Sequence, residues 1–213
     1  MNIIDLTHLI HQDMPVYPGT EPATIKQVSI LEREGYRELN IHINSHTGTH
    51  IDAPGHILDQ GIYLDKMDPE LFIGRAAILG FTAHKTNLIT LNKLKLYQEI
   101  IEKVEFVILK TRWSQYWGNE QYYKNYPYLS KEAAKWLSGY NLKGIGVDTI
   151  SIDGSNSKDF INHKTLLSKN MIIIENMTNL DSIQKKYFIL SVLPLKIKDS
   201  DGSPVRAIAI LNR

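Results

Sequence analysis

Residues 46–56 constrain this chain more than any other segment does. They read His-Thr-Gly-Thr-His-Ile-Asp-Ala-Pro-Gly-His, and they place three of the chain's eight histidines beside an aspartate. Gly48, Pro54 and Gly55 interrupt the segment, so a continuous helix through it is disfavoured. We expect its polar side chains to converge at a strand end and the adjoining turns, where glycine lets the backbone approach a bound group closely.

Four side chains of these types within eleven residues are typical of a metal site. Neutral imidazole and carboxylate suit zinc, manganese or iron, and a carboxylate can bridge two ions. The chain has no cysteine, which excludes a disulfide and a thiolate site, so nitrogen and oxygen must bind any metal. One histidine alone would more often be a hydrogen-bonded polar residue at a strand end, and it is the cluster that favours a metal.

The remaining pattern predicts many short strands and few helices. In residues 37–44, Leu39, Ile41 and Ile43 alternate with polar residues, which predicts a half-buried strand. Ser130 is a suitable N-cap for a helix that ends near Gly139. Strands are predicted at 3–9, 24–31, 37–44, 76–81, 106–109, 144–148, 171–174, 187–195 and 205–210, and helices at 91–104, 130–139 and 158–169.

This irregular order favours a mixed α/β fold over a doubly wound parallel sheet or a (β/α)8 barrel. No repeat or linker divides the chain, so we expect a single domain over residues 1–213. The net charge is +1 and no basic block is present, which argues against nucleic-acid or anionic-membrane binding. With no signal-peptide pattern and no apolar run of about 18 residues, we expect a cytoplasmic protein.

The string His-x-Gly-Thr-His-x-Asp-x-Pro-x-His, complete from His46 to His56, resembles the signature of the cyclase family of metal-dependent hydrolases. That family includes bacterial kynurenine formamidase (arylformamidase) and isatin hydrolase. Further landmarks of the family are similar to residues 5–7, 16–19, 111–113, 144–149, 151–153 and 175–176. The resemblance therefore extends over most of the chain.

The resemblance implies a ligand set for two divalent ions, zinc first and manganese as an alternative. His46, His50 and Asp52 match the ligands of the first metal, and Asp52 also matches a bridge to the second. His163 matches a ligand of the second metal, and Glu175 matches a bridging carboxylate. The resemblance also implies a swivelling β/β/α fold, with mixed sheets and flanking helices, and a homo-oligomer, commonly a dimer.

His56 matches the catalytic acid/base of the family, a task that suits imidazole because it exchanges protons near neutral pH. Tyr17 stands in a Pro-Gly turn where kynurenine formamidase carries a tryptophan, and we predict a contact between Tyr17 and an aromatic substrate. Simple packing at the turn is the alternative. Two other departures are Ile150, in place of a proline, and Lys164, in place of a second histidine. These departures bear on the substrate and leave the metal ligands intact.

Without the family, several polar residues have plainer interpretations. His163 lies in a polar helical segment and is interpreted as a solvated surface histidine. Glu175 ends the apolar run 171–174, where a buried carboxylate is costly unless it is paired or bound to a metal. Asp148 and Asp153 are interpreted as turn or supporting residues. No partner is evident from the sequence for His8, His11, His42 or His84.

The resemblance thus implies a metal-dependent amidohydrolase that acts on a small, aromatic amide. Conversion of N-formylkynurenine to formate and kynurenine, in tryptophan catabolism, is the first hypothesis. Hydrolysis of a cyclic amide or lactone is the second. A non-catalytic metal-binding scaffold is the third, and His56 argues against it because a binding module needs no acid/base.

Overall fold

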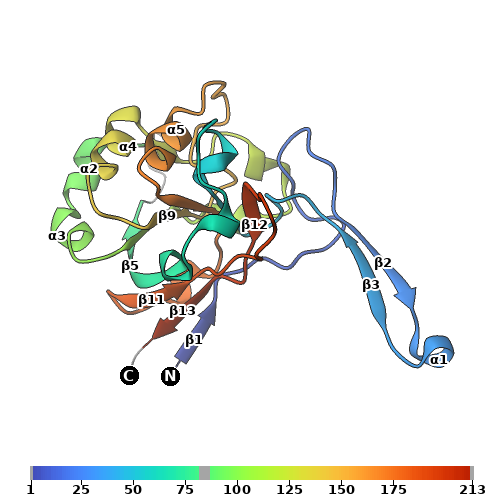
Figure 1. Ribbon diagram of the computed structural model, residues 1–213. Helices are drawn as coiled ribbons and strands as arrows, with labels where there is room; N and C mark the ends of the chain where they lie inside the picture. Colours follow the sequence, from blue (N-terminus) through green and yellow to red (C-terminus); the bar gives the residue numbers. More distant parts are fainter. Residues whose placement is uncertain (1, 82–86, 212–213) are drawn as a thin grey trace.

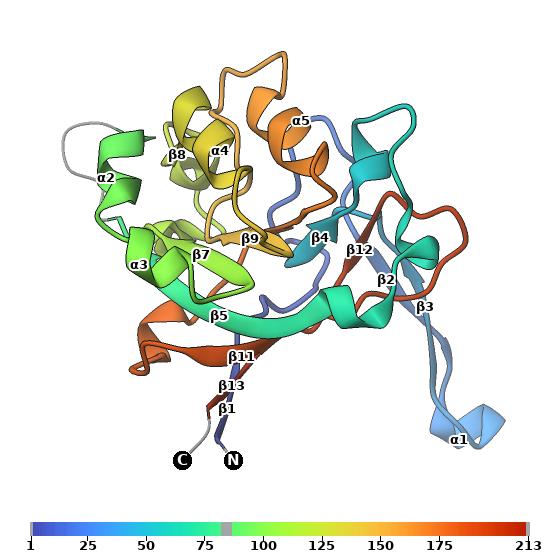
Figure 2. The same cartoon turned by 60° about the vertical axis from the view of Figure 1, so that its left-hand side comes forward.

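The structure, a computed structural model, describes residues 2–81 and 87–211. Its centre is a nine-stranded sheet that curls round an apolar interior (Figures 1 and 2). In sheet order the strands are β1 (Asn2–Asp5), β13 (Ile208–Leu211), β11 (Phe188–Ser191), β5 (Ile73–Gly80), β7 (Phe106–Lys110), β9 (Gly144–Val147), β10 (Ile172–Glu175), β4 (His50–Asp52) and β12 (Gly202–Pro204). Strands β5, β7, β9 and β10 run parallel, and the outer pairs are antiparallel. The predicted mixed α/β class is confirmed.

Short helices cover one face of the sheet (Figure 2). They are α2 (Leu91–Lys95), α3 (Gln98–Ile101), α4 (Lys131–Leu137) and α5 (Ile161–Leu167). Val107, Ile145 and Ile173 face these helices in one core cluster, whereas Ile108 and Ile174 face the curled interior in another. Because both faces of the central strands are buried, these strands have continuous apolar sequences.

Smaller elements complete the described chain. They are α1 (Leu31–Glu34), β2 (Thr24–Ser29), β3 (Glu38–His42), β6 (Leu88–Ile89), β8 (Tyr128–Leu129) and the 3-10 helices Pro54–His56, Leu64–Lys66, Pro69–Phe72, Trp113–Tyr116, Glu120–Tyr123 and Leu180–Ser182. No helix in the described ranges is both long and apolar enough to cross a membrane.

The boundaries of several predicted elements differ from the structure. The predicted helix at 91–104 is two short helices, because Tyr97 leaves the helical conformation with φ −107° and ψ 9°. The predicted helix at 158–169 begins only at Ile161, after Phe160 adopts a positive φ of 48°. Ser130 does cap α4, since its Oγ accepts a hydrogen bond from the Ala133 amide at 3.2 Å. Strand β12, which was not predicted, lies at the sheet edge beside β4.

Strands β2 and β3 form an antiparallel hairpin, here called the arm (residues 24–42), with α1 at its tip. Figure 1 shows the arm projecting away from the rest of the molecule. The predicted strands are therefore present, but the predicted half-burial of residues 37–44 is wrong for most of that segment. Every residue of β3 is exposed because the arm forms a two-stranded sheet of its own.

Candidate metal centre

Strands β4 and β10 present three of the predicted ligands on one face of the sheet. Side chains alternate along a strand, so His50 and Asp52 point to the same side while Ile51 between them enters the core. Glu175 is the register partner of His50 across the β4–β10 pair. The pleat thus places two carboxylates and an imidazole together on the side where α5 packs.

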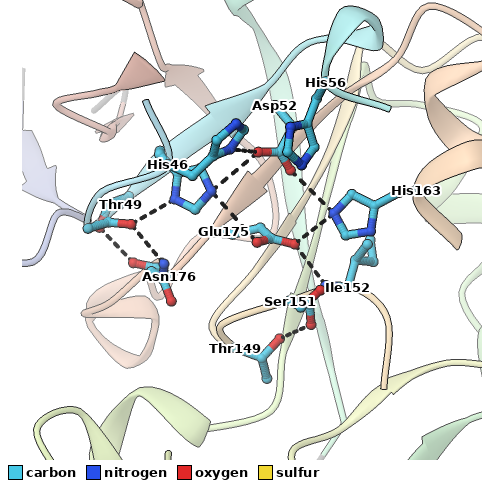
Figure 3. A network of polar contacts seen from close by, with 12 residues as sticks. His46, Thr49, Asp52, His56, Thr149, Ser151, Ile152, His163, Glu175 and Asn176 are labelled. Atoms are coloured by element: carbon cyan, nitrogen blue, oxygen red, sulfur yellow. Dashed lines mark hydrogen bonds and ion pairs between the residues drawn. The ribbon is translucent and has the colours of Figure 1, made fainter. Parts of the chain in front are cut away.

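Three segments bring the other predicted residues to the same place. His46 lies in the loop before β4, His56 ends the 3-10 helix Pro54–His56, and His163 lies on α5. Figure 3 shows these rings turned toward Asp52 and Glu175. All six predicted metal and acid/base residues line one cavity of about 220 Å³, together with Pro15, Val16, Tyr17, Thr20, Ile150, Ser151, Phe160 and Asn176.

Each of the two carboxylates has one oxygen near His50 and the other oxygen near His163, and Asp52 also contacts His46. Asp52 Oδ1 lies 2.6 Å from His46 Nδ1 and 3.3 Å from His50 Nε2, whereas Asp52 Oδ2 lies 3.5 Å from His163 Nε2. Glu175 Oε2 lies 3.7 Å from His50 Nε2, and Glu175 Oε1 lies 3.3 Å from His163 Nε2. Both carboxylates therefore connect the two groups, as bridging ligands do.

Four of these five separations suit cation ligands better than direct hydrogen bonds, whereas the 2.6 Å contact of His46 Nδ1 with Asp52 Oδ1 is a hydrogen bond. Ligands about 2.0–2.1 Å from a tetrahedral zinc ion stand roughly 3.3 Å apart. The contacts of His50 and His163 with the two carboxylates, at 3.3 to 3.7 Å, lie close to that spacing. Asp52 Oδ2 is buried and has no hydrogen-bond partner among the residues that the structure describes. A bound cation would satisfy this oxygen, and the donor set fits a divalent metal.

Hydrogen bonds behind the rings fix which imidazole nitrogens face the centre. His50 Nδ1 lies 2.8 Å from the Gly48 carbonyl oxygen, and His163 Nδ1 lies 2.7 Å from Asp153 Oδ2. In both residues Nδ1 is the donor, which leaves the Nε2 lone pair for a cation. Asp153 thus occupies the supporting position that the sequence suggested.

The electrostatics of the cluster favour a positive charge at its centre. Burial opposes protonation of His46, but hydrogen bonds to Asp201 and Asp52 outweigh it and raise the pKa of His46 to about 10. Burial likewise opposes protonation of His163, yet the neighbouring carboxylates raise its pKa well above the usual value. Burial would raise the pKa of Asp52, but the surrounding imidazoles of His163, His46 and His50 hold that pKa well below its usual range. Carboxylates that attract a proton this strongly also attract a metal cation.

The interpretation of His163 as a solvated surface residue is wrong, since only 4% of it is exposed. Helix α5 is short, and its buried side carries Asn162, His163, Leu166 and Leu167. A seven-residue helix shows too little periodicity for its inward face to be read from sequence. Its packing against the end of β10 decides the orientation.

Sequence reasoning missed Asp201, the residue directly before β12. Asp201 Oδ2 lies 2.9 Å from His46 Nε2 and 3.1 Å from His56 Nδ1, so one carboxylate contacts a predicted ligand and the predicted acid/base. Hydrogen bonds from His46 and His56 hold the pKa of Asp201 far below its usual range. The next residue, Gly202, packs so closely on His46 that a Cβ would lie 2.5 Å from the ring. In the sequence, Asp-Gly-Ser-Pro at 201–204 is typical of a polar turn, so nothing in it indicates a contact of Asp201 with the two histidines.

The remaining predicted residues lie at and around the cavity. Tyr17 is 40% exposed and lines the cavity, where burial and the charge of Glu175 raise its pKa. Ile150 also lines it, whereas Lys164 is exposed on the outer side of α5.

Of the other histidines in the part of the chain that the structure describes, His8, His11 and His42 do not line the cavity. His8 stacks on Trp117, and burial lowers its pKa to about 4. His11 and His42 are exposed, and His84 lies outside the described residues. Asp148 is buried and accepts hydrogen bonds from Thr111, as a turn residue would.

The fold places a cluster of histidines and carboxylates that could bind metal beside a small cavity. Comparison with known proteins shows which protein family has this fold and site. The family model named Cyclase matches residues 4–154. Kynurenine formamidases of Bacillus thuringiensis and Bacillus anthracis are each 31% identical over 206 residues, which covers 96% of this chain and 95% of the relative. The chain therefore belongs to the cyclase family of metal-dependent hydrolases.

Solved structures agree with this placement. Isatin hydrolase A from Ralstonia solanacearum is 25% identical, with a TM-score of 0.88 over 99% of this chain and 92% of that one. A structure described as a potential metal-dependent hydrolase with cyclase activity is 26% identical, with a TM-score of 0.77 over 98% of this chain and 96% of that one. The curled mixed sheet with few helices is thus the fold of the family.

Proposed function

We propose that the protein hydrolyses a C–N amide bond, with N-formylkynurenine as the first candidate substrate and formate and kynurenine as its products. One observation carries the proposal: a histidine held by a carboxylate stands in the same cavity as two adjoining sets of metal-ligating atoms. The similarity to kynurenine formamidases over nearly the whole chain supports the choice of substrate.

The ligand set assigned to each ion follows the division of carboxylate oxygens. His46, His50 and Asp52 would hold the first ion and His163 the second, with Asp52 and Glu175 as the carboxylates that contact both sides. Zinc is the first candidate and manganese the alternative, because both accept nitrogen and oxygen ligands. When bound, such ions supply a water acidified toward neutral pH and a Lewis acid that polarises a carbonyl.

His56 is the proposed general acid and base. In the tautomer that carries its proton on Nδ1, His56 donates a hydrogen bond to Asp201 Oδ2 at 3.1 Å and its Nε2 carries the lone pair. The ring lies beside His46, with centroids 4.0 Å apart, and lines the cavity. His56 Nε2 can therefore take a proton from the attacking water and return it to the departing amine nitrogen.

The cavity walls favour a small substrate with a flat group. Val16, Tyr17, Ile150 and Phe160 add apolar and aromatic surface to the lining of the cavity. A volume of about 220 Å³ is small for a ligand site, since typical sites span roughly 300–1,000 Å³. Tyr17 is the proposed contact with the aromatic ring.

A cyclic amide or lactone is the second candidate substrate. Two of the three departures from the formamidase pattern, Tyr17 and Ile150, line the cavity, so the differences fall where a substrate would lie. The similarity in fold to isatin hydrolase A points to the same alternative.

A substrate panel tests the proposal. Purified protein loaded with zinc or manganese is assayed for formate release from N-formylkynurenine, for ring opening of isatin, and for hydrolysis of an aliphatic formamide as control. Formate release from the aromatic substrate is expected. Turnover of isatin alone would favour the second candidate. Stoichiometric metal without turnover of any substrate would make the protein a metal-binding scaffold.

We also propose that residues 1–213 form one domain of the swivelling β/β/α class. The active form is a homo-oligomer, most simply a dimer.

A further inference from the structure

The pairing of β4 with β10 ends at the candidate metal centre, and side chains continue the connection beyond it. The last register pair is His50 with Glu175. Both segments then leave the extended conformation, since Gly48 has a φ of 64° and Asn176 a φ of 57°. Thr49 Oγ1 donates a hydrogen bond to the Asn176 carbonyl oxygen at 2.6 Å, and Asn176 Nδ2 donates one to the Gly48 carbonyl oxygen at 2.8 Å. Figure 3 shows Thr49 and Asn176 together on the side of the cluster away from His163.

The Gly48 carbonyl oxygen accepts a second hydrogen bond, from a predicted metal ligand. His50 Nδ1 lies 2.8 Å from this oxygen. A carbonyl oxygen has two lone pairs, and the bonds from Asn176 and His50 use both of them. The bond from Asn176 therefore fixes the direction in which the oxygen offers its other lone pair to His50. As a result the His50 proton stays on Nδ1, and His50 Nε2 points to the carboxylates, 3.3 Å from Asp52 Oδ1.

The left-handed backbone of Asn176 lets its side chain reach the cavity. In a continuing strand, residue 176 would point away from the face that carries Glu175, because side chains alternate. The chain instead turns at Asn176, and both Glu175 and Asn176 line the cavity. Asparagine enters the left-handed region more readily than most residues with a side chain. It therefore meets two demands at this position, the turn and the hydrogen-bond donor.

Tyr122 fixes which end of the Asn176 amide faces Gly48. The Tyr122 hydroxyl donates a hydrogen bond to Asn176 Oδ1 at 2.7 Å. A reversed amide would set its own oxygen against the Gly48 carbonyl oxygen, which is unfavourable. Tyr122 is fully buried and Asn176 is 4% exposed, so water does not compete strongly for these bonds. Trp113 Nε1 in turn donates to the Tyr122 carbonyl oxygen at 3.0 Å. A chain of contacts thus runs from an aromatic cluster to His50.

We propose that Asn176, oriented by Tyr122, is a positioning residue that holds His50 in the orientation in which it binds metal. Both ends of the Asn176 amide are engaged within the protein, so its effect passes through His50 and not through contact with the reacting atoms. The inference rests on the metal centre of the proposed function and is independent of the substrate. Groups that orient a metal ligand typically contribute about 10–100-fold to metal affinity.

Asn176→Gly tests the role of the amide. Glycine adopts the left-handed conformation freely, so this variant removes the side chain without straining the backbone. Competition with a chelator should show the zinc dissociation constant rising about 10–100-fold. Asn179→Gly is the matched control. Asn179 also has a positive φ, of 55°, and donates its Nδ2 to the Asp5 carbonyl oxygen at 2.9 Å, but it does not line the cavity. This control should keep the zinc affinity of the natural protein.

Tyr122→Phe tests the orientation of the amide with a milder change, because the ring is kept. Zinc binding should weaken by a smaller factor than in Asn176→Gly. The double variant should bind zinc as weakly as Asn176→Gly alone, because Tyr122 acts only through Asn176. In the cobalt-loaded protein, the visible absorption bands should shift in both single variants and stay unchanged in Asn179→Gly. Natural zinc affinity in Tyr122→Phe, or additive losses in the double variant, would overturn the proposal.

Urea unfolding of the metal-free proteins separates positioning from simple stabilisation. Asn176→Gly and Asn179→Gly each remove a hydrogen bond to a backbone carbonyl, so both should unfold at lower urea concentration, but only Asn176→Gly should lose zinc affinity. A loss of stability in Asn176→Gly with natural zinc affinity would overturn the proposal. A natural protein that binds no zinc would overturn it together with the ligand assignment. A natural protein that shows the expected affinities but hydrolyses no amide would support the inference and overturn only the proposed function.

Discussion

Strands β4 and β3 show how one sequence pattern leads to two different environments. Both belong to short segments in which apolar and polar side chains alternate. In β4 the apolar Ile51 enters the core and the polar His50 and Asp52 meet at the candidate metal centre. In β3 the apolar Leu39 and Ile41 remain exposed. Alternation therefore predicts that one face of a strand will be covered, but it does not say which molecule provides the cover.

The largest expected difference between the two regions concerns bound metal. Asp52→Ala removes the carboxylate that connects both groups of imidazoles, so it should lose most bound metal and almost all activity. Glu38→Ala removes an exposed carboxylate from the arm and should keep both. Elemental analysis and a formate-release assay check the pair. Full metal occupancy in Asp52→Ala would count against a shared carboxylate.

The second difference concerns proton transfer. His56→Ala should retain metal and fold, while kcat falls by about 10²–10⁴-fold, the usual contribution of a general acid or base. The limb of the pH–rate profile that depends on His56 should vanish. His42→Ala, an exposed histidine on the arm, should leave kcat and the profile unchanged. Metal loss in His56→Ala would instead make this residue a ligand.

The third difference concerns packing and uses a matched pair of isoleucines. Ile51→Ala should lower the free energy of unfolding by about 2–5 kcal/mol, because it empties a fully buried position. Ile41→Ala should change the free energy of monomer unfolding by no more than about 0.5 kcal/mol. Urea titration of the metal-free protein measures both. If Ile41→Ala lowered the free energy of unfolding as much as Ile51→Ala, the arm would be packed within its own chain and the contrast between β3 and β4 would be wrong.

The smallest expected effect separates positioning from ligation. Asp201→Asn keeps the shape of the side chain but removes the charge that orients His56 and His46, so activity should fall about 10–100-fold. We expect the loss in kcat rather than in KM when the metal is saturating. Glu38→Gln on the arm is the control. An unchanged kcat would remove Asp201 from the mechanism, and a loss reversed by added metal would assign it to metal retention alone.

The fold could be anticipated where local patterns are strong. The central strands 106–109 and 171–174 and the Ser130 cap were predictable. A strand buried on both faces is a continuous apolar run, and a helix cap is a single residue type at the helix start, so both signals lie within a few residues. The broken helix at Tyr97 and the edge strand β12 were not predictable. Their form depends on contacts with distant segments, such as the hydrogen bond from the Tyr97 hydroxyl to the Gly80 carbonyl and the pairing of Gly202 with Asp52.

The sequence by itself determined the kind of chemistry available. The spacing from His46 to His56, the absence of cysteine and the match to the cyclase signature predict a nitrogen and oxygen metal site on one short segment. Tertiary structure alone decided how that site is completed. Asp201 lies 145 residues beyond His56, and no local pattern records their contact. His163 became an inward-facing residue only when α5 packed against the sheet, and the arm became a free surface only when no other part of the described chain covered it. The spacing of nearby residues can be read from the sequence. The convergence of distant segments depends on how their buried faces pack together.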